Sequence, residues 1–249
     1  ITIGDMVRAQ AKLVEYLGID SLLAVAGGSM GGMQVLEWGV RFPERVRGLI
    51  PIAAPARSYP QAIAWNEVGR QAIMADPDWR GGDYYGGPGP VRGLATARML
   101  GMITYQSDAS MLKKFGRDMV PARARRPYTL STLFQVESYL EYQGQKLVNR
   151  FDANTYLYLT RALDLFDVSK GYGSLDEALG RIQCPTLVVG VTSDILYPVY
   201  QQLEIVAALQ RRGRPVEYAE IDSPHGHDGF LIDFHMMEPV LARFLARLR

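Results

Sequence analysis

The amino-acid sequence predicts an α/β fold, in which helices cover a sheet of parallel strands. Three observations support this prediction. Short apolar runs, typical of strands buried on both faces, recur along the chain, and runs with helical spacing separate them. A glycine-rich turn joins the first apolar run to the helix that follows it. The chain has 249 residues, enough for one large domain with a sizeable core.

The composition excludes several classes of protein. It is 48% hydrophobic and 21% charged, which is ordinary for a soluble enzyme. The net charge of +1 gives no indication of a nucleic-acid partner or an anionic membrane surface, and no apolar span reaches the length of a transmembrane helix. The single cysteine, Cys184, excludes an internal disulfide framework and favours the cytoplasm. Its place beside Pro185, at the head of an apolar run, predicts buried packing rather than nucleophilic chemistry.

The first third of the chain alternates between helices and strands. In order, we expect a helix, a strand, a helix, a strand and a helix at residues 5–17, 22–26, 33–42, 46–54 and 58–75. Thr2 or Asp5 is expected to cap the first helix, and Gly18 to end it. A helix connects the two strands, so we expect them to be parallel.

The middle of the chain differs in composition and in the spacing of its apolar residues. Residues 76–90 are rich in Gly, Pro, Asp and aromatic side chains, which predicts an ordered loop. Residues 91–179 have a helical pattern without strand-like runs, and segments 130–148 and 154–166 carry Tyr, Leu and Phe on one face. We expect a helical cap inserted over the sheet edge, with these faces forming a core or a dimer surface.

The sheet is then expected to resume. A strand is predicted at residues 185–191, a helix at 199–210, a strand at 215–221, and a helix from residue 230 to the end. The predicted organisation is therefore an α/β core formed by residues 1–75 and 181–249. A loop and helical cap are predicted for residues 76–180.

The turn between the first strand and its helix reads Gly27-x-Ser29-x-Gly31, the pattern of a nucleophile elbow. Such a turn holds the serine backbone in a strained conformation, so that its hydroxyl stands clear at the carboxyl edge of the sheet. The N–H of Met30, at the start of the helix, is then placed to stabilise an oxyanion. A glycine-rich turn with an ordinary serine is the alternative, unless an acid and a histidine follow.

Three histidines are present, and two of them lie in the loop after the last predicted strand. An α/β-hydrolase places its catalytic histidine there, in the chain order Ser, Asp, His. Gly226 favours His227, because a glycine lets the loop present the ring toward the serine. His225 is the alternative base, or a partner of His227 in a metal site, although no cluster elsewhere supports a metal. His235 falls in the last helix and is interpreted as structural.

Asp194 is the predicted acid, because it follows the carboxyl end of the strand at 185–191. A carboxylate there can accept the imidazole N–H, hold its tautomer and stabilise the imidazolium. Asp222 is a rival, but it lies too near His227 in the same loop. The sequence therefore predicts a Ser29–His227–Asp194 triad.

With these motifs in place, the chain resembles the homoserine O-acetyltransferases, α/β-hydrolase-fold acyltransferases of methionine biosynthesis. The blocks that begin at Asn66 and Asp76 are the most specific, because plain esterases do not share them. The matching stretches are residues 27–34, 66–73, 76–85, 97–99, 103–105, 114–117, 193–198 and 226–228.

The resemblance implies that Ser29 takes an acetyl group from acetyl-CoA and passes it to the homoserine hydroxyl. His227 would act as general base and acid, and Asp194 would orient it. Arg98 and Asp228 would hold the amino acid by its carboxylate and ammonium. The resemblance also implies a homodimer, and acetyl-CoA as a co-substrate rather than a cofactor. A succinyl donor, a serine acceptor, an esterase and a non-catalytic module remain as alternatives.

The family also implies several strands before the elbow and, after one of them, a loop that supplies the second oxyanion N–H. This chain begins about one helix before the elbow. We therefore expect an α/β-hydrolase fold with an inserted helical cap, in which the N-terminal strands are missing from this chain.

Overall fold

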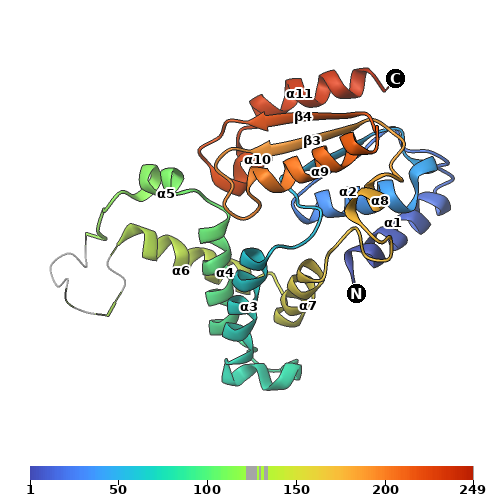
Figure 1. Cartoon of the computed structure of the whole chain (residues 1–249). Coiled ribbons are helices and arrows are strands. Elements are labelled where there is room, and N and C mark those ends of the chain that lie inside the picture. Colours follow the sequence, from blue (N-terminus) through green and yellow to red (C-terminus); the bar gives the residue numbers. More distant parts are fainter. Residues whose placement is uncertain (122–127, 129, 132–133, 249) are drawn as a thin grey trace.

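A parallel β-sheet organises the larger part of the molecule (Figure 1). The computed structural model describes residues 1–121, 128, 130–131 and 134–248. Within these residues the sheet has the order β1 (Val25–Gly28), β2 (Leu49–Ile52), β3 (Thr186–Val191) and β4 (Val216–Ile221), and all neighbours are parallel. The carboxyl ends of the strands therefore share one edge of the sheet, which is where Ser29, Asp194 and the loop of His227 follow.

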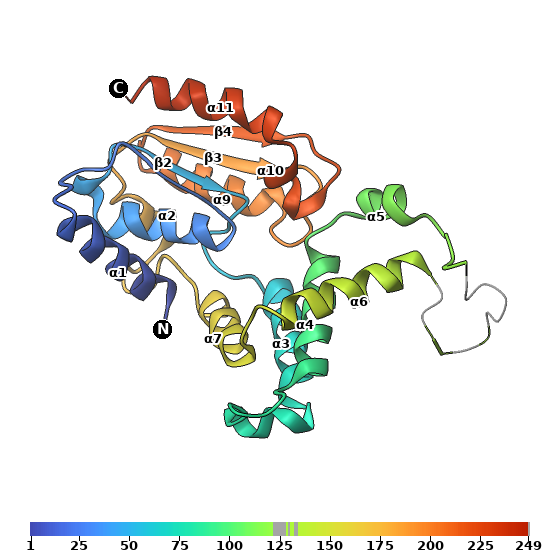
Figure 2. The ribbon, with the colours of Figure 1, turned by 180° about the vertical axis from the view of Figure 1, so that it is seen from behind.

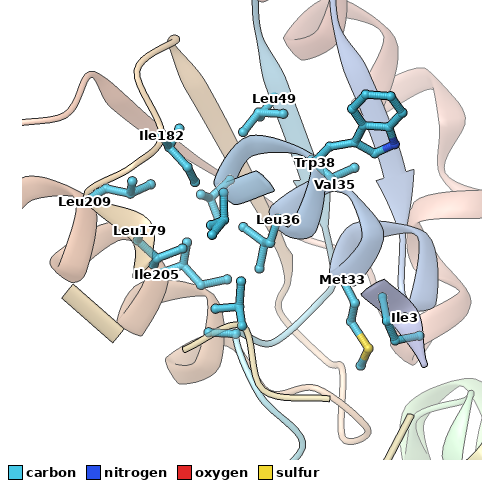
Figure 3. Packing of buried hydrophobic residues seen from close by; sticks show 14 of the residues in the cluster. Ile3, Met33, Val35, Leu36, Trp38, Leu49, Leu179, Ile182, Ile205 and Leu209 are labelled. Atoms are coloured by element: carbon cyan, nitrogen blue, oxygen red, sulfur yellow. The ribbon is translucent and has the colours of Figure 1, made fainter. Parts of the chain in front are cut away.

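Helices cover both faces of the sheet (Figures 1 and 2). On one face lie α2 (Met30–Arg41), α8 (Leu175–Leu179) and α9 (Val199–Arg211), with α1 (Ile3–Tyr16) packed against α2. The side chains that fill this side, including Met33, Leu36 and Ile205, are fully buried (Figure 3). On the other face, α11 (Phe234–Ala246) packs Met237 and Phe244 against residues of β2 and β3.

The local sequence explains where the first elements begin. Thr2 Oγ1 accepts a hydrogen bond from the Asp5 N–H, and the Asp5 carboxylate accepts one from the Thr2 N–H, so both predicted cap residues take part in one capping box. The strand predicted at residues 22–26 begins later, at Val25, and continues through Gly28. Leu22 forms only an isolated parallel bridge with Val46.

A second group of helices lies beside the carboxyl edge of the sheet (Figure 2). Its own buried cluster includes Ile73, Leu94, Ala97, Leu147 and Ala153. The elements are α3 (Pro60–Met74), the short turn η2 (Pro77–Gly82), α4 (Val91–Thr104), α5 (Asp108–Phe115), α6 (Gln135–Val148) and α7 (Ala153–Asp164). These elements correspond to the helical cap of the prediction, although residues 132–133 of its segment 130–148 lie outside the described residues.

The borders of this helical group differ from the predicted ones. Helix α3 was expected within the core of residues 1–75, but it packs against α4 and α7, and its Ile73 is buried in their cluster. Conversely, α8 was expected within the cap of residues 76–180, but it packs against α9 and α2 of the core. Both differences arise because amphipathic spacing shows which face of a helix is apolar and not what covers it.

The remaining short elements connect these parts. They are η1 (Pro43–Arg45), η3 (Gly226–Asp228) and α10 (Gly229–Ile232). The helix predicted from residue 230 to the end is thus divided at Asp233 into α10 and α11. None of the helices in the described part of the chain combines the length and apolar character needed to cross a bilayer.

Candidate active site

Ser29 is the residue that connects β1 to α2. Its backbone has φ 57° and ψ −122°, a conformation that costs a residue with a side chain about 1–3 kcal/mol. The surroundings hold it there, because its N–H donates to Ile52 O at 2.9 Å and its carbonyl accepts from Met33 N at 3.2 Å. The sheet therefore fixes one side of Ser29 and the helix the other, as expected for a nucleophile elbow.

Two glycines allow close packing around the elbow. A Cβ at Gly27 would lie 2.6 Å from the carbonyl carbon of Gly31, which backbone atoms cannot relieve. A Cβ at Gly28 would lie 2.3 Å from the ring of Phe230. Since Phe230 belongs to α10, Gly28 also lets the segment after His227 pack directly over the elbow.

Met30 is the first residue of α2. The first N–H groups of a helix have no acceptor within that helix, so the Met30 N–H is available to a group beside Ser29. The dipole of the helix adds partial positive charge at the same place. The structure thus puts the predicted oxyanion donor immediately after the serine.

Asp194 and His227 meet at the same edge of the sheet. His227 Nδ1 lies 2.7 Å from Asp194 Oδ2, and the two side chains are 5% and 0% exposed. The other oxygen of Asp194 accepts backbone N–H groups from Leu196 at 2.8 Å and Tyr197 at 2.9 Å. Asp194 is held rigidly by these bonds, and it orients the imidazole so that Nε2 is the nitrogen left for other chemistry.

Aromatic rings surround the imidazole of His227. Tyr197 and Phe230 pack edge-on, with ring centroids 5.3 Å and 5.6 Å away, and Tyr105 lies at 6.0 Å. Burial raises the pKa of the Tyr105 and Tyr197 hydroxyls, so both stay neutral at physiological pH.

A cavity of about 220 Å³ lies between the sheet edge and the helical group. Ser29, His227 and Asp228 all line it. No hydrogen bond joins Ser29 to His227 in the described part of the chain, although they share this cavity. Sequence reasoning gave no site role to the other polar or aromatic residues that line it, which are Trp65, Asn66, Thr104, Tyr105, Tyr156, Tyr197 and Phe230.

The two residues predicted to hold an amino acid are placed differently. Asp228 lines the cavity, and burial raises the pKa of its carboxyl although the charges of nearby groups, including Arg98 and Lys114, oppose this. Arg98 is not among the cavity-lining residues. Its guanidinium lies 5.6 Å from the ring centroid of Tyr105, and that ring lines the cavity.

The rival residues are engaged elsewhere. His225 Nδ1 lies 2.9 Å from Asp233 Oδ2, and Asp222 accepts a hydrogen bond from Thr192 at 3.2 Å. His235 is exposed on α11. Of the three histidines, all of them described, His227 is the one that lines the cavity.

The described residues contain no group of three or more His, Cys, Asp or Glu side chains that could hold a metal ion. Cys184 is buried, and burial raises the pKa of its thiol to about 11. The thiol is therefore protonated at neutral pH and packs as a small apolar side chain.

Relatives of the chain share both its sequence and its fold. It is 56% identical over 248 residues to the homoserine O-acetyltransferase of Symbiobacterium thermophilum, and the match covers 100% of this chain and 65% of that protein. The crystal structure of homoserine O-acetyltransferase from Bacillus anthracis superposes with a TM-score of 0.92 at 27% identity, over 98% of this chain and 65% of that one. Esterase E22 superposes with a TM-score of 0.89 at 26% identity, covering 98% and 67% of the two chains.

The chain thus spans 65% of the length of its Symbiobacterium relative. The sequence profile of the family described as "alpha/beta hydrolase fold" matches residues 1–234. Since that match includes the elbow, Asp194 and the loop of His227, the chain belongs to the α/β-hydrolase fold family.

Proposed function

We propose that the protein is a homoserine O-acetyltransferase, which transfers an acetyl group from acetyl-CoA to the side-chain hydroxyl of homoserine in methionine biosynthesis. The observation that carries this proposal is the 56% identity to an enzyme of that name, which extends over 248 residues. The shared cavity of Ser29 and His227, with Asp194 bound to His227, supplies machinery suited to acyl transfer.

The proposed reaction has two half-reactions. In the first, His227 takes the proton of Ser29, Ser29 Oγ attacks the thioester carbonyl, and the Met30 N–H stabilises the oxyanion. The carbon–sulfur bond then breaks, coenzyme A leaves with the proton from His227, and an acetyl ester remains on Ser29. In the second, His227 takes the proton of the acceptor hydroxyl, which attacks this ester, and the proton returns to Ser29.

Transfer competes with hydrolysis, so the acceptor must exclude water from the acyl-enzyme. The placement of the cavity under the helical group favours this. We propose that Asp228 binds the ammonium of the acceptor and that Arg98, held against Tyr105, attracts its carboxylate. Burial penalises the charged form of the Asp228 carboxyl and raises its pKa, and a bound ammonium would offset that penalty.

The likeness to esterase E22 favours a second candidate, ester hydrolysis with water as the acceptor. The two functions use the same first half-reaction and differ in the second. Transfer requires that continued release of coenzyme A over many turnovers depend on homoserine, whereas hydrolysis requires only water.

The test uses the protein at its full natural length. Acetyl-CoA is expected to acetylate Ser29, as seen by intact-protein mass, and homoserine is expected to accelerate coenzyme A release. Ser29→Ala should lower the transfer rate about 10⁴- to 10⁶-fold, because the nucleophile is lost. Parallel assays with succinyl-CoA and with serine identify the donor and the acceptor. Transfer that persists at a substantial rate in Ser29→Ala would exclude the covalent route.

We propose further that the protein is a cytoplasmic homodimer. The helical group exposes large apolar side chains on α6 and α7, including Tyr142, Tyr158 and Leu165 near its end, and such surfaces favour self-association. Sizing at two protein concentrations tests the dimer, which should dissociate on dilution if it is weak and elute unchanged if it is stable. A monomer at both concentrations would contradict the proposal.

A further inference from the structure

Asn66 lies on α3 and lines the same cavity as Ser29 and Asp228. It opens the block of residues 66–73 that is among the most specific in the sequence, and the mechanism above gives that block no role. The residues that follow it on the helix, Glu67 and Arg70, explain how its side chain is held.

Arg70 is a buried cation, and it is 3% exposed. Its Nη2 lies 2.6 Å from Glu67 Oε2 and 2.6 Å from Asp164 Oδ2. Asp164 ends α7 and its side chain is 4% exposed, so this ion pair joins two helices of the group inside the protein. Charges as deeply buried as these require each other, and they fix the position of the Asp164 carboxylate.

The Asp164 carboxylate in turn fixes the direction of the Asn66 amide. Asn66 Nδ2 lies 2.8 Å from Asp164 Oδ1. A carboxylate in an ion pair with a buried arginine accepts hydrogen bonds, so the amide nitrogen of Asn66 faces Asp164 and the reversed orientation, with the amide oxygen toward Asp164, is excluded. The carbonyl oxygen of Asn66 is consequently directed away from Asp164.

The carbonyl oxygen of Asn66 is available for binding. It accepts no hydrogen bond from the described residues, yet it is not among the buried polar atoms that lack a partner. It is therefore open to water, and the open space beside Asn66 is the cavity that it lines. The carbonyl oxygen of Asn66, a neutral hydrogen-bond acceptor of fixed orientation, thus faces the same cavity as the Asp228 carboxylate.

We propose that Asn66 Oδ1 accepts a hydrogen bond from the α-ammonium of the acceptor amino acid, alongside Asp228. This inference rests on the proposed function. An ammonium has three N–H donors, and a donor left without an acceptor in a dry site weakens binding. A neutral oxygen satisfies one donor without adding a second negative charge near Asp228. Arg70 and Asp164 then act as positioning residues for Asn66.

Separate measurement of the two half-reactions distinguishes binding of the ammonium by Asn66 from a general structural effect on the enzyme. Asn66→Ala is expected to leave the rate of Ser29 acetylation by acetyl-CoA within about twofold, because no acceptor is present in that step. The rate constant for homoserine with the isolated acetyl-enzyme should fall about 10- to 100-fold, the size of a lost hydrogen bond to a charged group. The expected loss with 4-hydroxybutanoate, which is homoserine without its amino group, is less than about threefold.

Gln71→Ala is the matched control. Gln71 lies on the same helix and donates its amide to the same network, to Glu67 Oε1 at 2.6 Å, but it is exposed and does not line the cavity. It should leave both half-reactions unchanged. Asn66→Ser serves as a second variant should the alanine substitution impair folding, and thermal unfolding of each variant checks this.

Three outcomes would overturn the inference. Equal losses with homoserine and 4-hydroxybutanoate would show that Asn66 does not bind the ammonium. A loss of the same size in the acetylation of Ser29 would indicate a general structural effect. An unchanged rate of transfer to homoserine in both Asn66 variants would show that Asn66 has no role in acceptor binding. Failure of the unmodified protein to form an acetyl-enzyme, by contrast, would overturn the proposed function itself.

Discussion

Two histidine–aspartate pairs lie at the same edge of the sheet, and their distances are almost equal. His227 Nδ1 is 2.7 Å from Asp194, and His225 Nδ1 is 2.9 Å from Asp233. The two histidines are separated only by Gly226, which has φ +70°. Because glycine adopts that conformation without strain, the chain can send the two rings in different directions.

The surroundings of the two pairs differ far more than their distances. The side chains of His227 and Asp194 are 5% and 0% exposed, whereas those of His225 and Asp233 are 22% and 14% exposed. His227 lines the cavity that contains Ser29, and His225 does not. The comparison teaches that residue types and spacing alone do not show which of two His–Asp pairs faces a cavity. Burial and position at the cavity distinguish the two pairs.

The more exposed pair has a role of its own in holding the loop. Ser223 Oγ donates to Asp233 and accepts the His225 N–H, while the Gly226 N–H donates to Ser193 Oγ at 2.9 Å. These bonds tie the loop after β4 to the loop after β3 and to the start of α11. The second pair thus helps to hold in place the loop that carries His227.

Replacing each histidine in turn is the strongest test of the difference between the two pairs. His227→Gln in the protein at its full natural length should lower the acetyl-transfer rate about 10⁴- to 10⁶-fold, because no base remains for Ser29. His225→Gln should lower it by less than about tenfold, because it only loosens the loop. Steady-state assays at saturating substrates measure both. Similar losses in the two variants would contradict the division of roles.

The sequence predicted which residues meet at this edge of the sheet better than it predicted how the helices pack around them. The elbow at Ser29, the strand end before Asp194 and the loop of His227 are local patterns, and parallel strands bring their carboxyl ends together. The choice of His227 over His225 depended on one glycine. The partner of His225 was not predicted, because Asp233 falls inside the helix expected from residue 230.

Contacts between distant segments were beyond sequence reasoning. Asn66 and Asp164 are separated by 98 positions, and their hydrogen bond depends on how α3 crosses α7. Nothing in the periodicity of either helix specifies that crossing, so the cavity-facing role of Asn66 and the placement of α3 with the helical group were both missed. The position of Arg98, which contacts the ring of Tyr105 and does not line the cavity, is another consequence of three-dimensional packing.

The acids of the two pairs offer a second, smaller contrast. Asp194→Asn should lower the transfer rate about 10³- to 10⁴-fold, because an amide stabilises the wrong tautomer of His227 and cannot balance the imidazolium. Asp233→Asn should change the rate by less than about threefold while lowering the thermal unfolding midpoint. Rates and unfolding curves on the same preparations test both. A large catalytic loss in Asp233→Asn would mean that the second pair takes part in the reaction.

The smallest expected effect concerns acid stability, and it belongs to the second pair alone. Hydrogen bonds from Ser223 and then His225 hold the pKa of the Asp233 carboxyl below its ordinary value. A lowered folded-state pKa stabilises the fold above the unfolded-state pKa of about 3.9, and this stabilisation is lost as the pH falls through the folded-state pKa.

The gap in unfolding midpoint between the unmodified protein and Asp233→Asn should therefore be widest near neutral pH and close on acidification below about pH 4. Asp222→Asn is the control, because Asp222 is exposed in the same loop and lies outside the pair. It should produce a small gap that does not vary with pH. A gap for Asp233→Asn that stays constant from neutral to acidic pH would mean that the carboxylate contributes only its shape, and that the contrast between the pairs is one of burial and not of charge.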